Sequence, residues 1–219
     1  MTGVQTCALP ISTRALAAAA ARHGVRTLAH ADGGGVLYLD RAADPALAAE
    51  LISASLDRIG VCNRLNLLLV HAEVWDTMLG VAGPVLRDRG VTASMPPHDH
   101  PLGHEWALDA GHEATVTVAP VDGPAQAAAV ANAETSGLAA SVVTTDPDAA
   151  RTFLDAYAGT GAFWNASTRL LDGFKLRGVP ETGINVDHVP GPRGPVTFED
   201  LYLRQYVVTP AGNGQPSAG

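Results

Sequence analysis

Short apolar runs of strand length alternate along this chain with alanine-rich segments of helical pattern, and this alternation constrains the fold most. The run Leu65–Val70 is unbroken, as expected for a parallel strand covered on both faces. Asp44 and Pro45, which open the preceding helical segment, are typical of a helix N-terminus. Strands that alternate with helices predict an α/β protein with a mostly parallel sheet flanked by helices.

The same patterns set the expected order of elements. The predicted strands are 35–40, 65–70, 91–95, 114–120, 140–144 and 162–165. The predicted helices are 15–22, 44–59, 73–87, 124–135 and 146–158. We expect Gly83–Pro84 to interrupt the third helix, because proline removes a backbone donor and clashes with the preceding turn.

The two ends of the chain differ from its middle. Residues 1–12 resemble a translated sequencing adapter, so they are left out of fold reasoning and the native start is expected to be missing. After Gly173 the composition shifts to glycine, proline and scattered charge, which predicts a loop-rich return segment and a terminal strand at 201–208. That strand must pair with the main sheet, a missing N-terminal half or another subunit. We therefore expect an α/β domain at 13–165, a return segment at 166–208 and a disordered tail at 209–219.

Composition and charge exclude several classes of function. The net charge is −8 and the pI is about 5.3, with no cluster of lysine and arginine, so a nucleic-acid or anionic-membrane surface is not expected. No apolar run reaches the roughly 18 residues that span a bilayer. Only one cysteine, Cys62, remains outside residues 1–12, so an intrachain disulfide framework is excluded. The expected partner is a small molecule or a protein, and the expected compartment is the reducing cytosol.

Cys62 is the candidate nucleophile. It lies between a helical pattern and a buried strand, where connections often line a ligand crevice in open α/β sheets. Arg64 would favour the thiolate, and Asn63 would donate a hydrogen bond to an oxyanion. The alternative is that Cys62 is a small buried apolar residue, and spacing alone does not decide between the two.

Several sequence blocks occur in the order and spacing of a known family. They are His30–Gly33, Leu37–Asp40, Val61–Asn63 with Leu67–His71, Thr135–Gly137 with Val142–Thr144, Asn165–Arg169 with Asp172–Phe174, and Arg193–Pro195. Over residues 25–208 the chain resembles gamma-glutamyl phosphate reductase, a family of the aldehyde dehydrogenase superfamily that acts in proline biosynthesis. The resemblance implies an aldehyde-dehydrogenase-like catalytic domain, with the return segment leading to a cofactor and oligomerisation region.

The resemblance also implies a reaction, the reduction of L-glutamyl 5-phosphate to glutamate 5-semialdehyde by NADPH through a thioester on Cys62. Most of the cofactor-binding half precedes His30 in this family, so the chain alone is not expected to bind NADPH well or turn over. NADP rather than NAD rests on the family alone. A full-length protein would form a homo-oligomer through the terminal strand.

Further site residues follow from the resemblance. Polar side chains that would hold the substrate's phosphate or carboxylate are Asn165, Ser167, Thr168 and Arg169. Glu181 would contact the cofactor ribose, and His30 and Asp32 would line the same pocket. The alternatives are a capped loop with a surface arginine, a solvated carboxylate and a simple Asp-Gly turn, respectively.

The chain departs from the family at several positions. The polar residues usual after Ser136–Gly137 are replaced by Leu138–Ala140, so the identity of the acyl group is less certain than the type of reaction. Two alternatives stay open, another oxidoreductase of the aldehyde dehydrogenase superfamily and a noncatalytic scaffold relative.

A histidine-dense stretch, His98–His112, lies outside the resemblance. Imidazoles and carboxylates at this density are potential ligands for zinc, but their spacing matches no standard closed site. We favour a solvated loop followed by a helix near 105–110, and we assign no metal. Trp75, Trp106 and Trp164 are expected as core or interface anchors, because no basic residues interleave them.

Overall fold

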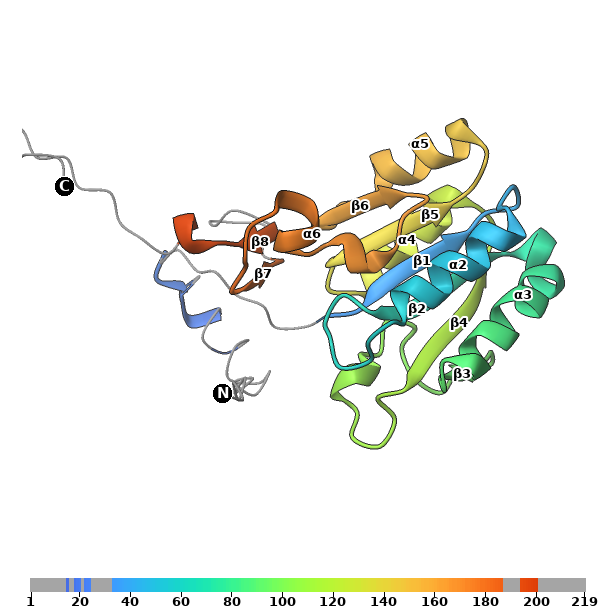
Figure 1. Ribbon diagram of the computed structural model, residues 1–219, viewed down its shortest axis with the longest axis horizontal. Helices are drawn as coiled ribbons and strands as arrows, with labels where there is room; N and C mark the ends of the chain where they lie inside the picture. Colours follow the sequence, from blue (N-terminus) through green and yellow to red (C-terminus); the bar gives the residue numbers. More distant parts are fainter. Residues whose placement is uncertain (1–14, 16–17, 21, 25–32, 187–193, 201–219) are drawn as a thin grey trace, which may run out of the picture.

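The computed structural model describes residues 15, 18–20, 22–24, 33–186 and 194–200. Its centre is a six-stranded sheet in which every strand pairs in parallel with its neighbours (Figure 1). The strands, in spatial order, are β3 (Thr92–Ser94), β4 (Thr115–Val121), β2 (Leu65–His71), β1 (Gly35–Leu39), β5 (Ala139–Val143) and β6 (Gly161–Trp164). The predicted parallel α/β sheet is confirmed, with all six strands within a few residues of their expected bounds.

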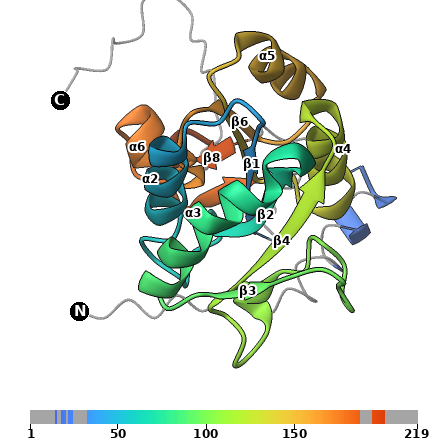
Figure 2. The same ribbon diagram turned by 90° about the vertical axis from the view of Figure 1, so that its right-hand side faces the viewer.

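Helices cover both faces of this sheet (Figure 2). On one face α2 (Pro45–Ser55) packs beside α3 (Trp75–Asp88), and on the other α4 (Pro124–Glu134) packs beside α5 (Pro147–Ala156). Connections that move from β1 toward β3 thus use one face, and those that move toward β6 use the other. Strands β1 and β2 are buried along their whole length, which explains why β2 reads as an unbroken apolar run.

Two helices begin where the sequence predicts because an aspartate caps each of them. The Asp44 side chain accepts a hydrogen bond from the backbone of Leu47, and Asp146 accepts from Asp148 and Ala149. Each is followed by proline at the first helical position. The first of these helices, α2, ends at Ser55 instead of residue 59, since Leu56 leaves helical geometry and is buried.

The expected interruption of the third helix is wrong. Helix α3 runs without a break through Pro84, whose ring lies on an exposed position. Met78, Ala82 and Leu86 share the opposite, buried stripe and pack into the core against β2 and α2. Burial of that stripe outweighs the roughly 3 kcal/mol that an internal proline costs a helix.

The return segment contains more regular structure than its composition suggests. After β6 come a 3₁₀ turn η3 (Thr168–Leu170), a short helix α6 (Gly173–Arg177) and an antiparallel hairpin of β7 (Gly183–Asn185) and β8 (Gly194–Val196). Three further 3₁₀ turns are η1 (Ala72–Val74), η2 (Trp106–Leu108) and η4 (Phe198–Asp200). The predicted strand 201–208, the tail 209–219 and His30 and Asp32 lie outside the described residues. No helix in the described part of the chain is long and apolar enough to cross a membrane.

Candidate functional site

Cys62 lies in the turn that leads into β2, at the amino edge of the sheet, and the chain entering β1 holds this turn. The backbone nitrogen of Gly34 donates to the carbonyl of Cys62 at 2.7 Å, and that of Gly35 donates to Arg64 at 2.7 Å. A Cβ atom on Gly33 would lie 2.7–2.9 Å from Cys62 atoms, so only glycine allows this approach. The crevice rule for open sheets concerns the carboxyl edge, so it does not account for this position.

Cys62 is partly exposed and lies beside a small apolar cluster. Its neighbours there include Leu138, Leu171 and Ile184. Burial raises the pKa of the thiol, and the carboxylates of Glu181 and Glu105 raise it further, while the guanidinium of Arg169 lowers it. Cys62 is therefore not sealed in the core, and this environment does not hold its sulfur as a thiolate.

Asn63 joins the Cys62 turn to the return segment. It is buried, and its side-chain nitrogen donates to the carbonyl of Leu171 at 2.8 Å. Its side-chain oxygen accepts from Arg169, and its backbone oxygen accepts from the Thr168 hydroxyl at 2.7 Å. These bonds hold Arg169 against the Cys62 turn, where its charge lowers the pKa of the thiol. One hydrogen of the Asn63 side-chain amide donates to Leu171, and the predicted hydrogen bond to an oxyanion would use the other.

The rest of the polar block divides into two groups. Arg169 is only 12 % exposed and donates from Nε to Asp57 at 2.7 Å, and the hydroxyl of Ser167 bonds that of Ser55 at 3.0 Å. Both lie at the amino edge with Cys62. Thr168 is fully buried between Asn63 and β1, so it packs the site rather than facing a ligand.

Asn165 is not part of this group. It lies where β6 ends, with a left-handed backbone at φ 51°, and both ends of its amide bond the backbone of Thr144, at 3.0 and 2.9 Å. The chain then turns back along the sheet toward Gly35, where Thr168 lies. The resemblance groups Asn165 with Arg169 because they are close in sequence, but in the structure Asn165 ties the carboxyl ends of two strands together.

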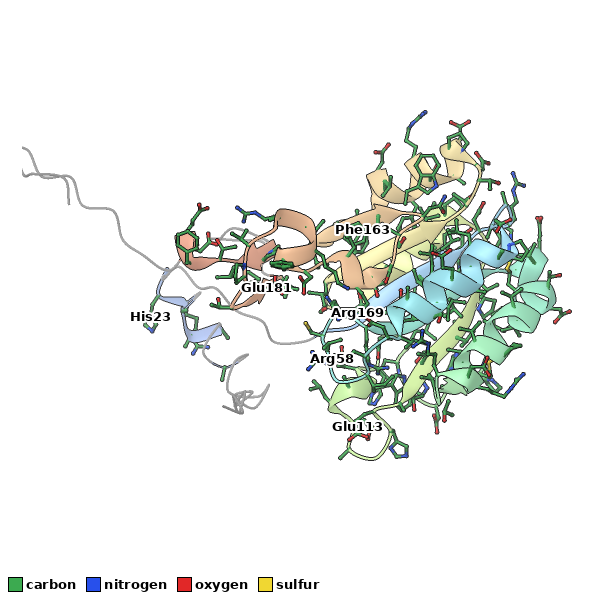
Figure 3. All side chains as sticks on the ribbon, in the orientation of Figure 1. His23, Arg58, Glu113, Phe163, Arg169 and Glu181 are labelled. Carbon is green, nitrogen blue, oxygen red and sulfur yellow. The ribbon has the colours of Figure 1, made fainter. Side chains whose placement is uncertain are left out.

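Glu181 is close enough to Cys62 for its charge to raise the pKa of the thiol. One of its carboxylate oxygens accepts the backbone N–H of Gly173 at 2.7 Å, at the first turn of α6. Burial raises the pKa of Glu181 itself, and the nearby Asp172 adds to this. Glu181 and Arg169 both belong to the return segment, and Figure 3 labels the two side chains.

The expected effect of Arg64 on the thiol is wrong. Its side chain is fully buried and turns away from the Cys62 turn, toward the start of β4. Nη1 donates to the carbonyl of Thr115 at 3.1 Å, and Nη2 contacts the Asn66 side chain at 3.4 Å. The cation that lowers the pKa of the thiol is Arg169.

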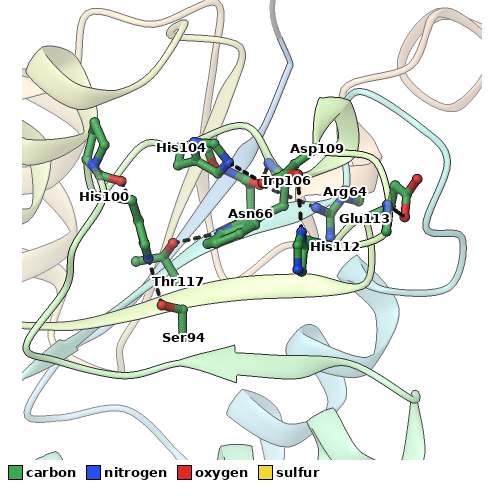
Figure 4. Close-up of polar contacts among 12 residues, drawn as sticks. Arg64, Asn66, Ser94, His100, His104, Trp106, Asp109, His112, Glu113 and Thr117 are labelled. Atoms are coloured by element: carbon green, nitrogen blue, oxygen red, sulfur yellow. Dashed lines mark hydrogen bonds and ion pairs between the residues drawn. The ribbon is translucent and has the colours of Figure 1, made fainter.

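The histidine-dense stretch is not the solvated loop expected from its composition. The buried Asn66 side chain donates to the carbonyl of His104 at 2.7 Å and accepts from the backbone of Trp106 at 3.2 Å. The Trp106 indole donates to Thr117 at 2.9 Å, and His104 bonds Asp109 at 3.0 Å (Figure 4). The helix expected near 105–110 is the single turn η2. Within the described ranges, no group of three or more histidine, cysteine or acidic residues is placed to hold a metal ion.

This stretch forms one wall of a pocket beside the Cys62 turn. The pocket has a volume of about 370 Å³. Its lining residues are Gly33, Pro101, Gly103, His104, Glu105, Ala133, Glu134, Thr135 and Ser136. Gly33 belongs both to this lining and to the close contact with the Cys62 backbone, so the pocket lies beside the Cys62 turn, although Cys62 is not among the lining residues. The sequence pattern did not indicate that Glu105 would line a pocket. Only its place in a stretch dense in histidine and tryptophan marked it.

Comparison with known proteins gives a consistent result, although no family model matches the chain. It is 33% identical over 198 residues to gamma-glutamyl phosphate reductase of Synechococcus sp. (strain JA-3-3Ab), covering 86% of this chain and 43% of that protein. An enzyme of the same name from Thermus thermophilus is 34% identical over 188 residues, covering 81% and 45%.

Solved structures agree with the sequence comparison. A crystal structure of gamma-glutamyl phosphate reductase from Thermotoga maritima matches with a TM-score of 0.74 and 25% identity, over 84% of this chain and 48% of that one. An acetylating aldehyde dehydrogenase from Geobacillus thermoglucosidasius matches in fold alone, with a TM-score of 0.65 and 13% identity over 89% and 56%. The chain spans less than half the length of the curated relatives it matches. It is thus a partial-length relative of the gamma-glutamyl phosphate reductases, with the fold of the aldehyde dehydrogenase superfamily.

Proposed function

We propose that this chain carries the nucleophile-bearing part of an NADPH-dependent acyl phosphate reductase, with Cys62 as nucleophile and L-glutamyl 5-phosphate as the family's substrate. The observation that carries the proposal is the position of the Cys62 thiol. Cys62 is partly exposed, the charge of Arg169 lowers the pKa of its thiol, and its turn lies beside a pocket of about 370 Å³ that Gly33 lines. The homology of the chain to reductases of acyl phosphates supports it.

The reaction uses the sulfur of Cys62 twice. Its thiolate attacks the acyl carbon, a C–S bond forms, and the bond from that carbon to the phosphate oxygen breaks with release of inorganic phosphate. NADPH, when bound, supplies the hydride that converts the resulting thioester to a thiohemiacetal. The C–S bond then breaks, the aldehyde leaves, and the sulfur returns as a thiolate.

Arg169 suits the anionic end of the substrate. Its Nε is bonded to Asp57, while Nη1 reaches Asn63 beside the thiol, so the guanidinium lies where a departing phosphate would need positive charge. A bound phosphate dianion is itself negative, so its charge does not offset the carboxylates that raise the pKa of Cys62. It can lower that pKa only by drawing Arg169 closer to the thiol. We therefore infer that Arg169 positions phosphate, and that Asn63 holds Arg169 in place.

Glu181 fits the proposed contact with a cofactor ribose. Only its Oε2 is used by the backbone of Gly173, so Oε1 can accept a ribose hydroxyl. Its raised pKa reflects partial burial, as expected for a carboxyl group in a site that a ligand would cover. NADP rather than NAD remains part of the proposal.

Acylation by a small acyl phosphate tests the nucleophile without requiring turnover. The Cys7→Ser variant leaves Cys62 as the only thiol in the chain, and acetyl phosphate serves as the probe. We expect an acetyl group on Cys62, found by mass spectrometry of the intact chain and its peptides, together with one inorganic phosphate released for each adduct.

Two control variants define the result. A Cys7→Ser, Cys62→Ser chain should form no adduct, and a Cys62→Ser chain that retains Cys7 reports the reactivity of an ordinary thiol. Acetylation of Cys62 no faster than that of Cys7 would contradict the proposal and favour the noncatalytic alternative. Another dehydrogenase of the superfamily would be indicated if an acyl adduct formed on Cys62 from an aldehyde and NADP but not from acetyl phosphate.

A further inference from the structure

Arg169 is held at two points by the segment that leads from α2 to the nucleophile. Its Nε donates to a carboxylate oxygen of Asp57 at 2.7 Å, and its Nη1 donates to the side chain of Asn63. Both partners lie between the end of α2 and the start of β2, in the segment that also carries Cys62. The guanidinium is therefore fixed relative to the Cys62 turn, and not only relative to η3.

The contact between Asp57 and Arg169 follows a buried contact that lies two residues earlier in both segments. Ser55, the last residue of α2, is fully buried, and its hydroxyl bonds that of Ser167 at 3.0 Å. The same hydroxyl accepts the backbone N–H of Thr168 at 3.2 Å. Because the end of α2 is joined to η3 in this way, Asp57 meets the guanidinium at a fixed place.

Part of the guanidinium can still bind a ligand. A guanidinium carries five N–H donors, and Arg169 uses one at Nε and one at Nη1. In the described part of the chain Nη2 has no hydrogen-bond acceptor, and it is not one of the buried atoms without a partner, so it reaches solvent. The Nη2 edge can therefore meet an anion while Nε stays bonded to Asp57.

Asp57 has two opposing effects on an anion at this edge. Its charge repels a bound phosphate, but Asp57 is 45% exposed, so solvent weakens the repulsion. Its hydrogen bond fixes the direction of Arg169, whose long side chain would otherwise adopt several rotamers. Ordering an arginine is among the largest rotamer costs of any side chain, whereas exposed charges contribute little, so the orienting effect is the larger.

We propose that Asp57 is a positioning residue for the phosphate of the substrate, because it orients Arg169 so that Nη2 faces the anion. This assignment rests on the function proposed above, in which Cys62 is the nucleophile and Arg169 positions phosphate. Asp57 lies outside the sequence blocks that carry the family resemblance, since it precedes Val61–Asn63. Arg169 touches the phosphate, and Asp57 acts only through Arg169.

Two reagents that acetylate the same thiol but differ in charge test this role. Acetyl phosphate and p-nitrophenyl acetate deliver the same acetyl group to Cys62, and only the first carries a phosphate. The readout, in the Cys7→Ser background, is the ratio of the two acetylation rates, in which a change in the pKa of the thiol cancels. Arg169→Gln should lower this ratio about tenfold, because it removes a charge-assisted contact with the phosphate.

The comparison of Asp57→Asn with Asp57→Ala holds the charge constant. Asparagine keeps an oxygen that can accept from Nε of Arg169, whereas alanine removes it. We expect the ratio to be about fivefold higher in Asp57→Asn than in Asp57→Ala, the size of effect of one hydrogen bond. Asp148→Ala is the matched control, because it breaks the exposed Arg151–Asp148 ion pair of α5, and it should leave the ratio unchanged.

Each outcome bears on a different step of the proposal. Equal ratios in Asp57→Asn and Asp57→Ala, together with a lowered ratio in Arg169→Gln, would overturn the positioning role and leave the proposed function intact. A ratio that Arg169→Gln does not change would overturn the phosphate contact of Arg169, and the role of Asp57 with it. If neither reagent acetylates Cys62, the proposed function itself fails.

Discussion

At the scale of single residues, the site depends on how neighbouring charges set the reactivity of Cys62. Burial and two carboxylates keep the thiol protonated to higher pH than an ordinary cysteine, and Arg169 opposes them. A thiol in this setting reacts slowly with an uncharged reagent, whereas the proposed function expects an acyl phosphate, whose phosphate Arg169 would position, to react faster. The pH dependence of the reactivity of Cys62 is therefore the most direct measure of how the surrounding charges shift the pKa of its thiol.

The first prediction concerns that profile. Alkylation of Cys62 by iodoacetamide should rise with pH and reach its midpoint above that of a free cysteine, because the pKa of the thiol is raised. Glu181→Gln removes a negative charge and should move the midpoint to lower pH. Arg169→Gln removes the positive charge and should move it to higher pH.

The two variants are expected to shift the alkylation midpoint in opposite directions, so a general loosening of the fold cannot produce both results. Glu113→Gln, whose side chain is distant in sequence and exposed, should leave the midpoint unchanged. Midpoints that move in the same direction for Glu181→Gln and Arg169→Gln would show that access to the sulfur, rather than charge, controls its reactivity.

The sequence located part of this site and missed part of it. Cys62, Asn63 and Arg169 meet in the structure, and the resemblance had grouped them. Asn165 was misplaced because closeness in sequence does not show that the chain reverses after β6. Glu105 was missed because its approach to Cys62 depends on the buried Asn66, a tertiary contact over 38 residues that no local pattern reports.

At the scale of elements, the return segment is fastened to the sheet at Gly35. A Cβ atom there would lie 2.7 Å from the Thr168 side chain and 2.8 Å from the carbonyl of Arg64. Because Thr168 also bonds Asn63, this contact links η3, β1 and the Cys62 turn. The position of Arg169 relative to the thiol thus depends on the absence of a side chain at residue 35.

The second prediction is that Gly35→Ala lowers the free energy of unfolding by about 1–3 kcal/mol, the usual cost of overpacking a close contact. It should also change the alkylation rate of Cys62, since η3 must move. Gly60→Ala is the control, because nothing lies within 4 Å of a Cβ there, and it should change stability by less than about 1 kcal/mol. Urea unfolding measures both, and a Gly35→Ala chain as stable as the parent would contradict the close packing of η3 on β1.

A second set of contacts lies at the carboxyl edge of the sheet, where hydrogen bonds of Asp40 join β1 to β5. It accepts hydrogen bonds from the hydroxyls of Tyr38 and Thr144, each at 2.8 Å, and from the backbone of Ala42 at 3.2 Å. Burial alone would raise the pKa of Asp40, but these bonds outweigh it and the pKa is lowered. The ionised form therefore stabilises the fold.

The third prediction follows from the lowered pKa of Asp40. Asp40→Asn should cost about 2 kcal/mol at neutral pH, because an amide cannot accept all three bonds. A lowered pKa in the folded state means that the contribution is complete above the unfolded value near 3.8 and is lost as pH falls through the folded value. The stability difference between parent and variant should therefore narrow in acid.

Urea unfolding at several pH values measures this difference. Asp88→Asn is the control, because Asp88 is exposed at the end of α3, and its effect should stay within about 0.5 kcal/mol. A gap between the Asp40→Asn chain and its parent that does not narrow with acid would show that the cost is steric rather than electrostatic.

Element boundaries show where local patterns suffice and where they do not. Capped starts such as Asp44 and Asp146 were predictable because the cap and its proline are adjacent in sequence. The continuity of α3 through Pro84 was not, because it depends on packing against the core. The β7–β8 pairing was also missed, since two three-residue strands carry too little periodicity to detect.

At the scale of the whole molecule, the two faces of one sheet support separate apolar cores. One core packs α2 and α3 against one face, and the other packs α4 and α5 against the opposite face. Adjacent residues of β2 contribute to different cores, Leu68 to the first and Leu69 to the second, and both are fully buried. Because both cores pack on the same strands, unfolding of one core exposes the opposite face of the strands that carry the other.

The fourth prediction is that Leu68→Ala and Leu69→Ala each lower the free energy of unfolding by about 2–5 kcal/mol, although they act on opposite faces. In each variant the transitions seen by circular dichroism and by tryptophan fluorescence should shift together, because unfolding of one core removes the support of the other. Leu108→Ala, at a 54% exposed position, should change little. Transitions that separate in one variant would mean that the two cores unfold independently. The reactivity of Cys62, whose turn enters the shared strand β2, would then follow the unfolding of only one core.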